Sequence, residues 1–162
     1  MTQKGFGPGL YVDTSCLLKL FFFEPESARV AAIVEGEQRV VVSELAILEG
    51  VVQIHARRVA GLIGAADAKR LESALDRVVA AEPFSLVPVA PDALQTARAQ
   101  VRRTRKRVPC RTLDRLHLGI MEVEGIRRLL TNDDRQAEAA RALGMRVLLP
   151  RRSRRAALGR RA

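Results

Sequence analysis

The sequence predicts an α/β protein, a three-layer α/β/α sandwich with a mainly parallel central sheet. Short apolar runs of strand length alternate along the 162 residues with longer segments of helical periodicity. Strands that alternate with helices imply right-handed crossovers, and therefore parallel pairing with helices on both faces of the sheet. The core must be built mainly from Leu, Val, Ile and Ala, because the chain has no Trp, one Tyr and five Phe.

Each element is expected from its apolar pattern and its boundary residues. The strands are expected at residues 9–13, 39–43, 84–89, 128–131 and 145–150. The helices are expected at residues 14–23, 25–36, 43–60, 65–81, 91–103, 112–125 and 134–144. Thr14 or Ser15 is the expected cap of the first helix, and Thr112 of the sixth. The second helix should have Pro25 in its first turn and Gly36 after its end.

The length favours one domain, expected over residues 9–150, because a chain of this size buries roughly two thirds of its unfolded surface. Residues 151–162 form an Arg-rich tail that we expect to be disordered. Cys16 and Cys110 have no CxxC or Cys/His spacing, which indicates reduced, structural thiols in a cytoplasmic protein. The apolar run "CLLKLFFF" is interrupted by Lys19 and has no cleavage site, so it predicts neither a membrane span nor a signal peptide.

The net charge of +10 is concentrated in two segments. Residues 98–111 carry seven basic side chains and no acid, and residues 151–162 carry six and no acid. The rest of the chain has 15 basic and 18 acidic residues. Concentrated Arg attracts phosphate backbones, so these segments predict nucleic-acid binding that weakens as salt rises. The alternatives are a solvated loop for the first segment and a solubilising end for the second.

Two aspartates follow predicted strands. Asp13 ends the strand at residues 9–13, and Asp133 follows the strand at residues 128–131. In parallel sheets, sites gather where strands end at their carboxyl edge. The alternative for each is helix capping, and Asp134, the next residue, keeps that interpretation as a first-turn helix acid.

The helix at residues 43–60 carries an acid at the edge of its expected core face. Its apolar stripe is expected to comprise Leu45, Leu48, Val51, Val52 and Ala56. Glu49 lies at the edge of that stripe. Glu44, by contrast, is a first-turn acid that suits the helix dipole.

A second helix repeats this arrangement. Asp114 lies one and two turns before Leu118 and Met121, on the expected core side, although capping is again the alternative. The only histidines, His55 and His117, have no partner at metal-ligand spacing, so zinc is disfavoured. We interpret His55 as a surface residue and His117 as a packed helix residue.

Acids that face a core must be paired or must bind a metal, because an isolated buried carboxylate costs several kcal/mol. Oxygen-only ligands favour Mg²⁺ or Mn²⁺. Metal-assisted hydrolysis of a phosphodiester would suit such a cluster. Neither a Ser/His/Asp or Cys/His arrangement nor a glycine-rich phosphate loop competes with it in the sequence.

Four stretches together resemble the acidic motifs of PIN-domain nucleases, most closely the VapC-type toxins. In order they are "YVDTSCLLKLF", "VVVSELAILEGVVQIHARR", "RTLDRLHLGIM" and "LLTNDDRQAEAARALGMRVL". The resemblance covers residues 10–149. It departs from the family pattern at Cys16 and Gly119, where small aliphatic residues are common, and at Asp134, where a basic residue is frequent.

The resemblance implies a PIN-like fold and an endoribonuclease that uses Mg²⁺ or Mn²⁺. It implies a cognate antitoxin partner of the VapB type and a homodimer. The four acids of the family, which bind metal and serve catalysis, fall on Asp13, Glu49, Asp114 and Asp133. Ser15 and Thr131 match hydroxyl positions near the metal site.

The leading hypothesis is therefore a metal-dependent toxin ribonuclease in the cytoplasm. Asp13 and Asp114 are the expected direct metal ligands, completed by Glu49 and Asp133 directly or through water. RNA phosphates are expected to bind the basic run, at Arg102, Arg103, Arg105, Lys106 and Arg107. Two alternatives stay open: a PIN nuclease of RNA processing that is not a toxin, and an RNA-binding or partner-binding module without catalysis.

Overall fold

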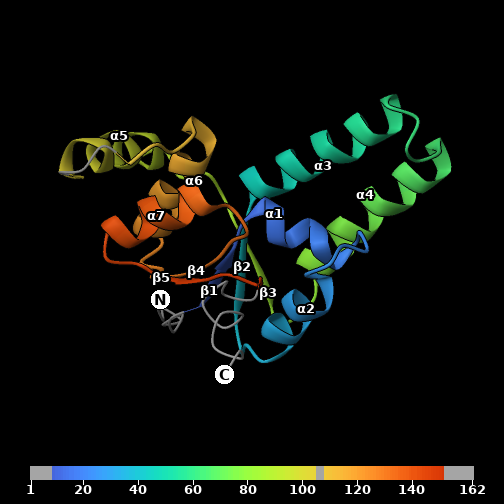
Figure 1. Cartoon of the computed structure of the whole chain (residues 1–162), viewed down its shortest axis with the longest axis horizontal. Coiled ribbons are helices and arrows are strands. Elements are labelled where there is room, and N and C mark those ends of the chain that lie inside the picture. The colour runs from blue at the N-terminus through green and yellow to red at the C-terminus, as the bar shows by residue number, and fades with distance from the viewer. Residues whose placement is uncertain (1–8, 105–107, 152–162) are drawn as a thin grey trace, which may run out of the picture.

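A computed structural model describes residues 9–104 and 108–151. Its centre is a five-stranded sheet with the order β3-β2-β1-β4-β5, in which every neighbouring pair is parallel (Figure 1). The strands are β1 Leu10–Val12, β2 Val40–Ser43, β3 Phe84–Val87, β4 Arg128–Leu130 and β5 Arg146–Leu148. All five predicted strands are confirmed.

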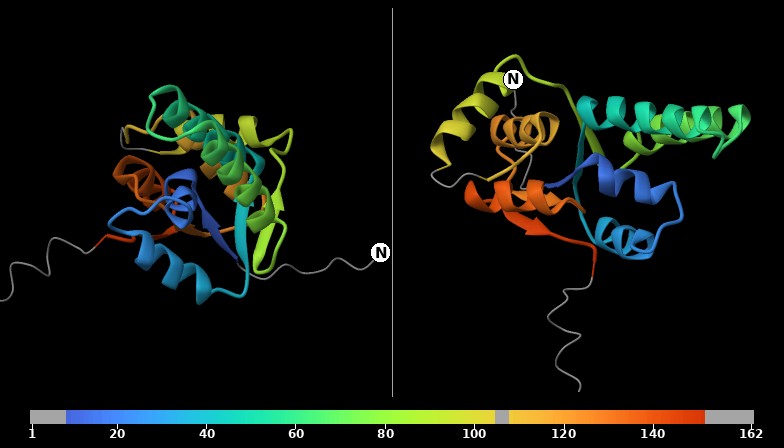
Figure 2. Two further views of the ribbon diagram at one scale, coloured as in Figure 1. Left: turned by 90° about the vertical axis from the view of Figure 1, so that its right-hand side faces the viewer. Right: turned by 45° about the horizontal axis from the view of Figure 1, so that its top comes forward.

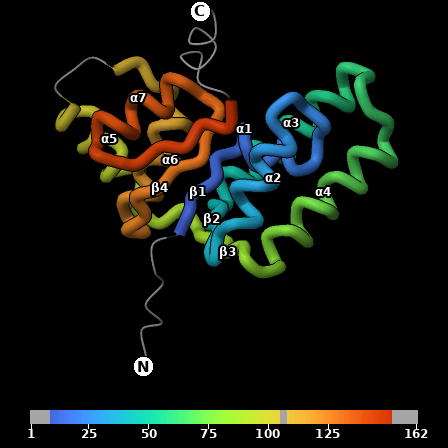
Figure 3. Tube along the Cα trace, turned by 60° about the horizontal axis from the view of Figure 1, so that its bottom comes forward, coloured from blue at the N-terminus to red at the C-terminus, as the bar shows by residue number. Residues whose placement is uncertain are grey.

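Helices cover both faces of the sheet, as the predicted sandwich requires. They are α1 Thr14–Leu17, α2 Ser27–Glu35, α3 Glu44–Val59, α4 Ala65–Val79, α5 Ala93–Arg103, α6 Thr112–Val123 and α7 Asp134–Ala142, with a 3₁₀ turn, η1, at Leu18–Leu20. Figure 3 shows α5, α6 and α7 on one side of the strands and α1 to α4 on the other. The right-hand view of Figure 2 shows α3 and α4 side by side, projecting from the sheet.

The strands divide their side chains between two cores, because successive residues of a strand point to opposite faces. Tyr11, Val41 and Leu129 pack with buried residues of α6 and α7. Leu10 and Val40 pack on the other face, with buried residues of α1, α2, α3 and α4. The two cores hold the carboxyl ends of β1, β2 and β4 in fixed positions from both sides.

The predicted cap residues of two helices were wrong, although both helices begin where predicted. Asp13, rather than Thr14 or Ser15, caps α1, because its side chain already accepts the backbone N–H of Cys16. Arg111 occupies the cap position of α6, so the predicted cap, Thr112, is the first helical residue.

The predicted second helix starts later than expected. Pro25 lies before α2, which begins at Ser27, whereas Gly36 follows its last residue as predicted. The predicted first helix ends early, at Leu17, and continues as the 3₁₀ turn η1.

The predicted core face of α3 was largely wrong. Of the expected stripe only Leu45 is buried and Val51 half-buried, whereas Leu48, Val52 and Ala56 are exposed. The buried residues of α3 are Leu45, Ala46, Gly50 and Ile54. Gly50 explains this rotation, since Leu75 Cδ2 of α4 lies 3.0 Å from the position of an added Cβ. The helix therefore approaches α4 closely at Gly50.

A second close approach joins α5 to α6. A Cβ added at Gly119 would lie 2.5 Å from the Ala93 carbonyl oxygen and 2.9 Å from Ala97 Cβ. The departure from the family pattern at this position thus corresponds to a helix crossing that has no room for a methyl group. This close crossing holds α6, the helix that carries Asp114, tightly against α5.

Both cysteines are free, as predicted. In the described ranges every helix is too short or too polar to span a bilayer. Apart from Arg151, the predicted disordered tail at residues 151–162 lies outside the described residues, and so does the run Arg105, Lys106 and Arg107.

Candidate active site

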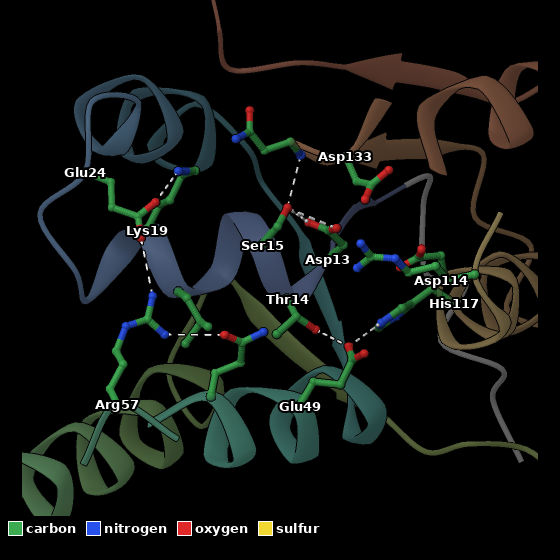
Figure 4. Close-up of a pocket in the computed structure, with 14 residues that line it drawn as sticks. Asp13, Thr14, Ser15, Lys19, Glu24, Glu49, Arg57, Asp114, His117 and Asp133 are labelled. Carbon is green, nitrogen blue, oxygen red and sulfur yellow. Dashed lines mark hydrogen bonds and ion pairs between the residues drawn. The ribbon is translucent and has the colours of Figure 1, made fainter. Parts of the chain in front are cut away.

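A cavity of about 300 Å³ opens at the carboxyl edge of the sheet. The four acids singled out in the sequence all line it: Asp13, Glu49, Asp114 and Asp133. They come from four elements, the ends of β1 and β4 and the helices α3 and α6. Figure 4 shows the three aspartates gathered on one side of this cavity and Lys19, Glu24 and Arg57 on the other.

Asp13 is buried and fully hydrogen-bonded. Its Oδ1 accepts from Ser15 Oγ at 2.8 Å and from the Cys16 backbone N–H at 3.1 Å. Its Oδ2 accepts from Thr131 Oγ1 at 2.8 Å. Burial raises the pKa of Asp13, although these hydrogen bonds oppose the rise. Because the buried charge is disfavoured, a nearby cation would stabilise it.

Asp133 caps a helix and also lines the cavity. Its Oδ1 accepts the backbone N–H groups of Arg135 at 2.7 Å and Gln136 at 3.0 Å, which makes it the N-cap of α7. The sequence suggested that Asp133 either caps a helix or belongs to the site. In the structure it caps α7 and also lines the cavity. Its Oδ2 accepts no hydrogen bond from a described residue and is free to bind a ligand. Asp134, as predicted, is a first-turn helix acid.

The two hydroxyls predicted near the site link these aspartates. Thr131 Oγ1 donates to Asp13 and accepts the Asp133 backbone N–H at 3.0 Å. Ser15 Oγ donates to Asp13 and accepts the Asn132 backbone N–H at 3.1 Å. Two hydrogen bonds, both donated by residues that follow β4, therefore tie the ends of β1 and β4 together.

Asp114 projects into the cavity from the first turn of α6. Its Oδ2 is buried and has no hydrogen-bond partner among the described residues. Burial, and then repulsion from Asp133, raise the pKa of Asp114. A buried carboxylate oxygen that lacks a hydrogen-bond partner and lies near other carboxylates is suited to bind a cation.

Glu49 enters from α3 and is held through one oxygen. Its Oε2 accepts a short hydrogen bond from Thr14 Oγ1 and another from His117 Nε2 at 2.8 Å. Burial disfavours the charged form, but the two hydrogen bonds outweigh burial and lower the pKa of Glu49. Glu49 is therefore ionised and presents Oε1 to the cavity.

Basic residues occupy the opposite side of the cavity, although two of them are already paired. Lys19 is buried and forms ion pairs with Glu24 and with Glu26, the latter at 2.9 Å. Arg57 Nη2 lies 3.6 Å from Glu24 Oε1. Arg111 also lines the cavity, and its charge opposes the rise in the pKa of Asp114.

The donor set suits a hard divalent cation, because it consists of carboxylate oxygens and one of them is a buried orphan. As the side chains lie, no three His, Cys, Asp or Glu groups within residues 9–104 and 108–151 are close enough to hold one ion. Binding would thus require small side-chain movements. Asp133 Oδ2 and Glu49 Oε1 have the freedom for them.

Of the predicted RNA-binding residues, the two that the structure describes, Arg102 and Arg103, do not line the cavity. Arg102 is exposed, and Arg103 pairs with Glu122 at 2.6 Å. Neither lines the cavity, and the other three predicted residues lie outside the described ranges. Arg111, from the same basic segment, lines the cavity.

Sequence reasoning missed two site residues. His117 was interpreted as a packed helix residue, and it is indeed buried, yet it bonds Glu49. Thr14 was considered only as a cap. His117 lies three residues after Asp114, and this spacing on one helix face could have indicated that both meet the same cavity.

The chain belongs to the PIN domain family, whose model matches residues 10–142. The matched range contains all four acids and both hydroxyls. PIN nucleases generally depend on divalent metals. No significant match was found among curated proteins.

Several solved structures share the fold at low sequence identity. Mycobacterium tuberculosis VapC20, a sarcin-ricin loop cleaving toxin, is 17% identical with a TM-score of 0.64, over 81% of this chain and 95% of that one. FitAcB from Neisseria gonorrhoeae is 16% identical with a TM-score of 0.65, over 87% and 97%. A toxin-antitoxin complex from Klebsiella pneumoniae is 16% identical with a TM-score of 0.60, over 90% and 99%.

Proposed function

We propose that this PIN domain is a metal-dependent endoribonuclease and the toxin of a toxin-antitoxin pair. The observation that carries the proposal is the meeting of four carboxylates from four elements in one cavity. The shared fold with VapC20 and with toxin-antitoxin complexes supports it. The substrate is RNA, and the cognate partner is an antitoxin of the VapB type.

Asp13, Asp114, Asp133 and Glu49 would hold Mg²⁺ or Mn²⁺. When bound, the cation supplies Lewis acidity, which lowers the pKa of the attacking water and offsets charge on the departing oxygen. Asp13 keeps a fixed orientation because both of its oxygens are hydrogen-bonded. Asp114 contributes its orphaned oxygen, and Arg111 attracts an RNA phosphate to the rim of the cavity.

The test is RNA cleavage with Mg²⁺ or Mn²⁺ and with EDTA, for two matched variants of α3. Glu49→Gln should abolish cleavage, whereas Glu44→Gln, an exposed acid on the same helix, should retain it. Salt-sensitive RNA binding without EDTA-sensitive turnover would instead support the non-catalytic binding module.

Toxicity separates a toxin from a nuclease of RNA processing. Expression of the chain should arrest growth, and co-expression of a small protein encoded immediately upstream should relieve the arrest. Growth without arrest, combined with cleavage in vitro, would favour the RNA-processing nuclease.

The proposed homodimer has a candidate surface on α3. Leu48, Val52 and Val59 are 61%, 58% and 71% exposed and lie along one face of this helix. Two antiparallel copies of α3 would place Glu44 of one near Arg58 of the other, an arrangement that is self-complementary. Val52→Lys should convert a dimer to a monomer in sedimentation, and an unchanged mass would exclude this surface.

A further inference from the structure

A buried chain of hydrogen bonds leads from the core to Glu49. Ser43 Oγ lies 2.6 Å from Tyr11 Oη, and Tyr11 Oη lies 2.6 Å from His117 Nδ1. His117 Nε2 lies 2.8 Å from Glu49 Oε2. Ser43, Tyr11 and His117 are each at most 1% exposed. The chain is therefore shielded from water until it reaches the cavity, where Figure 4 shows its last link.

The donor and the acceptor of each hydrogen bond follow from the charge of Glu49 and from the proton that Tyr11 retains. An ionised Glu49 only accepts, so His117 Nε2–H must donate. In a neutral ring Nδ1 then accepts, and the donor is the Tyr11 hydroxyl. Burial raises the pKa of Tyr11, which therefore keeps its proton. Ser43 in turn donates to Tyr11 and accepts the Ala46 backbone N–H at 3.2 Å.

We propose that His117 is a positioning residue whose Nε2–H, with Nδ1 held by the Tyr11 hydroxyl, fixes Glu49 so that only Oε1 is available to a cation. Thr14 and His117 together occupy Oε2. His117 is not itself a ligand, because both ring nitrogens are already hydrogen-bonded. The inference rests on the proposed function, since it concerns how the metal site is oriented.

The placement of the chain in the fold supports this role. Tyr11 lies in β1, two residues before Asp13, which directly follows this strand, and His117 is three residues after Asp114 on α6. Ser43 caps α3, the helix that carries Glu49. A single hydrogen-bonded path thus couples the three elements that hold these acids. Outer partners of this kind orient ligands and are worth roughly 10- to 100-fold in metal affinity.

The first test compares His117→Gln with His117→Asn, using Mn²⁺ binding measured by electron paramagnetic resonance. The Gln amide can replace Nε2–H, whereas the shorter Asn amide reaches only the position of Nδ1. We expect His117→Asn to weaken Mn²⁺ binding roughly 10-fold or more and His117→Gln to stay within about 3-fold of the parent chain. Equal affinities for the two variants, whether both parental or both weakened, would overturn the proposal.

The second test needs no substitution at His117. The chain has two histidines, and His55 is exposed, so ¹⁵N-histidine labelling gives Nδ1 and Nε2 signals from two rings, which His55→Gln assigns. We expect the Nε2–H tautomer for His117 in both the parent chain and Tyr11→Phe, because ionised Glu49 only accepts, and a shifted Nδ1 signal in Tyr11→Phe, where the hydrogen bond from Tyr11 is lost. An Nδ1–H tautomer, or a spectrum unchanged by Tyr11→Phe, would overturn the proposal.

Failure of the nuclease assignment gives a different result. If Asp13→Asn and Asp114→Asn retain full RNA cleavage, the proposed function is wrong whatever the His117 variants do. If those two variants are inactive while His117→Asn binds Mn²⁺ like the parent chain, the nuclease assignment stands and only the positioning role of His117 is lost.

Discussion

The junctions β1–α1 and β4–α7 are two versions of one local design. Their strands are parallel neighbours, and each junction places an aspartate at the N-cap of the following helix. In the first, Asp13 comes directly after the strand and is buried. In the second, Thr131 and Asn132 intervene, and Asp133 is half-buried.

This difference shows how position relative to the strand end separates two roles. Asp13 has both oxygens hydrogen-bonded and carries a disfavoured buried charge. Asp133 uses one oxygen as the cap and leaves the other free. The first junction therefore supplies a fixed anion, and the second an adjustable one.

The largest effect should come from Asp13→Asn. Loss of the fixed anion should reduce single-turnover RNA cleavage in Mn²⁺ by about 1,000-fold, roughly 4 kcal/mol in activation free energy. Asp133→Asn should reduce it less, by about 10- to 100-fold. Equal losses at the two positions would remove the distinction between the junctions.

Asp133→Asn and Asp133→Ala separate the two roles of this residue. Asn caps helices as well as Asp does, so Asp133→Asn should lose activity and keep stability. Asp133→Ala should lose the same activity and, in addition, about 1 kcal/mol of unfolding free energy. Urea denaturation measures the second loss, and an Asn variant as unstable as the Ala variant would argue against the cap.

Thr131→Val tests the hydrogen bond that links the two junctions. The unfolding free energy lost in this variant should depend on pH. Burial raises the pKa of Asp13, so the folded protein holds this proton more tightly than the unfolded chain, and ionisation destabilises the fold. The hydrogen bond from Thr131 opposes that rise. Its loss should therefore cost about 1–3 kcal/mol of unfolding free energy at pH 7.

The cost should shrink as the pH falls through the raised pKa of folded Asp13 toward about 3.9, the usual Asp pKa, because Asp13 is then protonated in the folded state with or without Thr131. Urea denaturation at pH 7 and pH 4 gives the comparison, with Thr112→Val, at an exposed threonine of α6, as the control. A cost independent of pH would mean that Thr131 does not act through Asp13.

The smallest effect should come from Asp134→Asn. Asp134 is exposed and, among the residues that the structure describes, pairs only with Arg151 at the surface, a contact worth less than about 1 kcal/mol. Cleavage should change by less than about 2-fold. A loss larger than that of Asp133→Asn would mean that the site acid was assigned one residue too early.

The order of strands and helices could be predicted because each carries its own periodicity, and the four acids because each follows a strand or lies near a core face. The exposed face of α3 could not be predicted from the sequence. Leu48 and Val52 form a stripe typical of a core, but the tight contact at Gly50, which sets the rotation of the helix, involves Leu75 of another helix. A pattern within one helix does not contain that information.

The hydrogen bonds of the site could not be predicted from the sequence either. Asp133 was expected to be either a cap or a site acid, because a residue type does not show that its two oxygens can act separately. The role of His117 depends on Tyr11, 106 residues earlier in the chain. Only the folded sheet brings the two side chains together.

The helix crossing at Gly119 has a consequence for how this sequence can diverge. Since even a methyl group would meet the carbonyl oxygen of Ala93, no single replacement at position 119 is neutral. A descendant with alanine there must also shift α5 and change the residues along its contact with α6. Positions 93, 97 and 119 should therefore covary as a unit among close relatives, independently of selection on the acids.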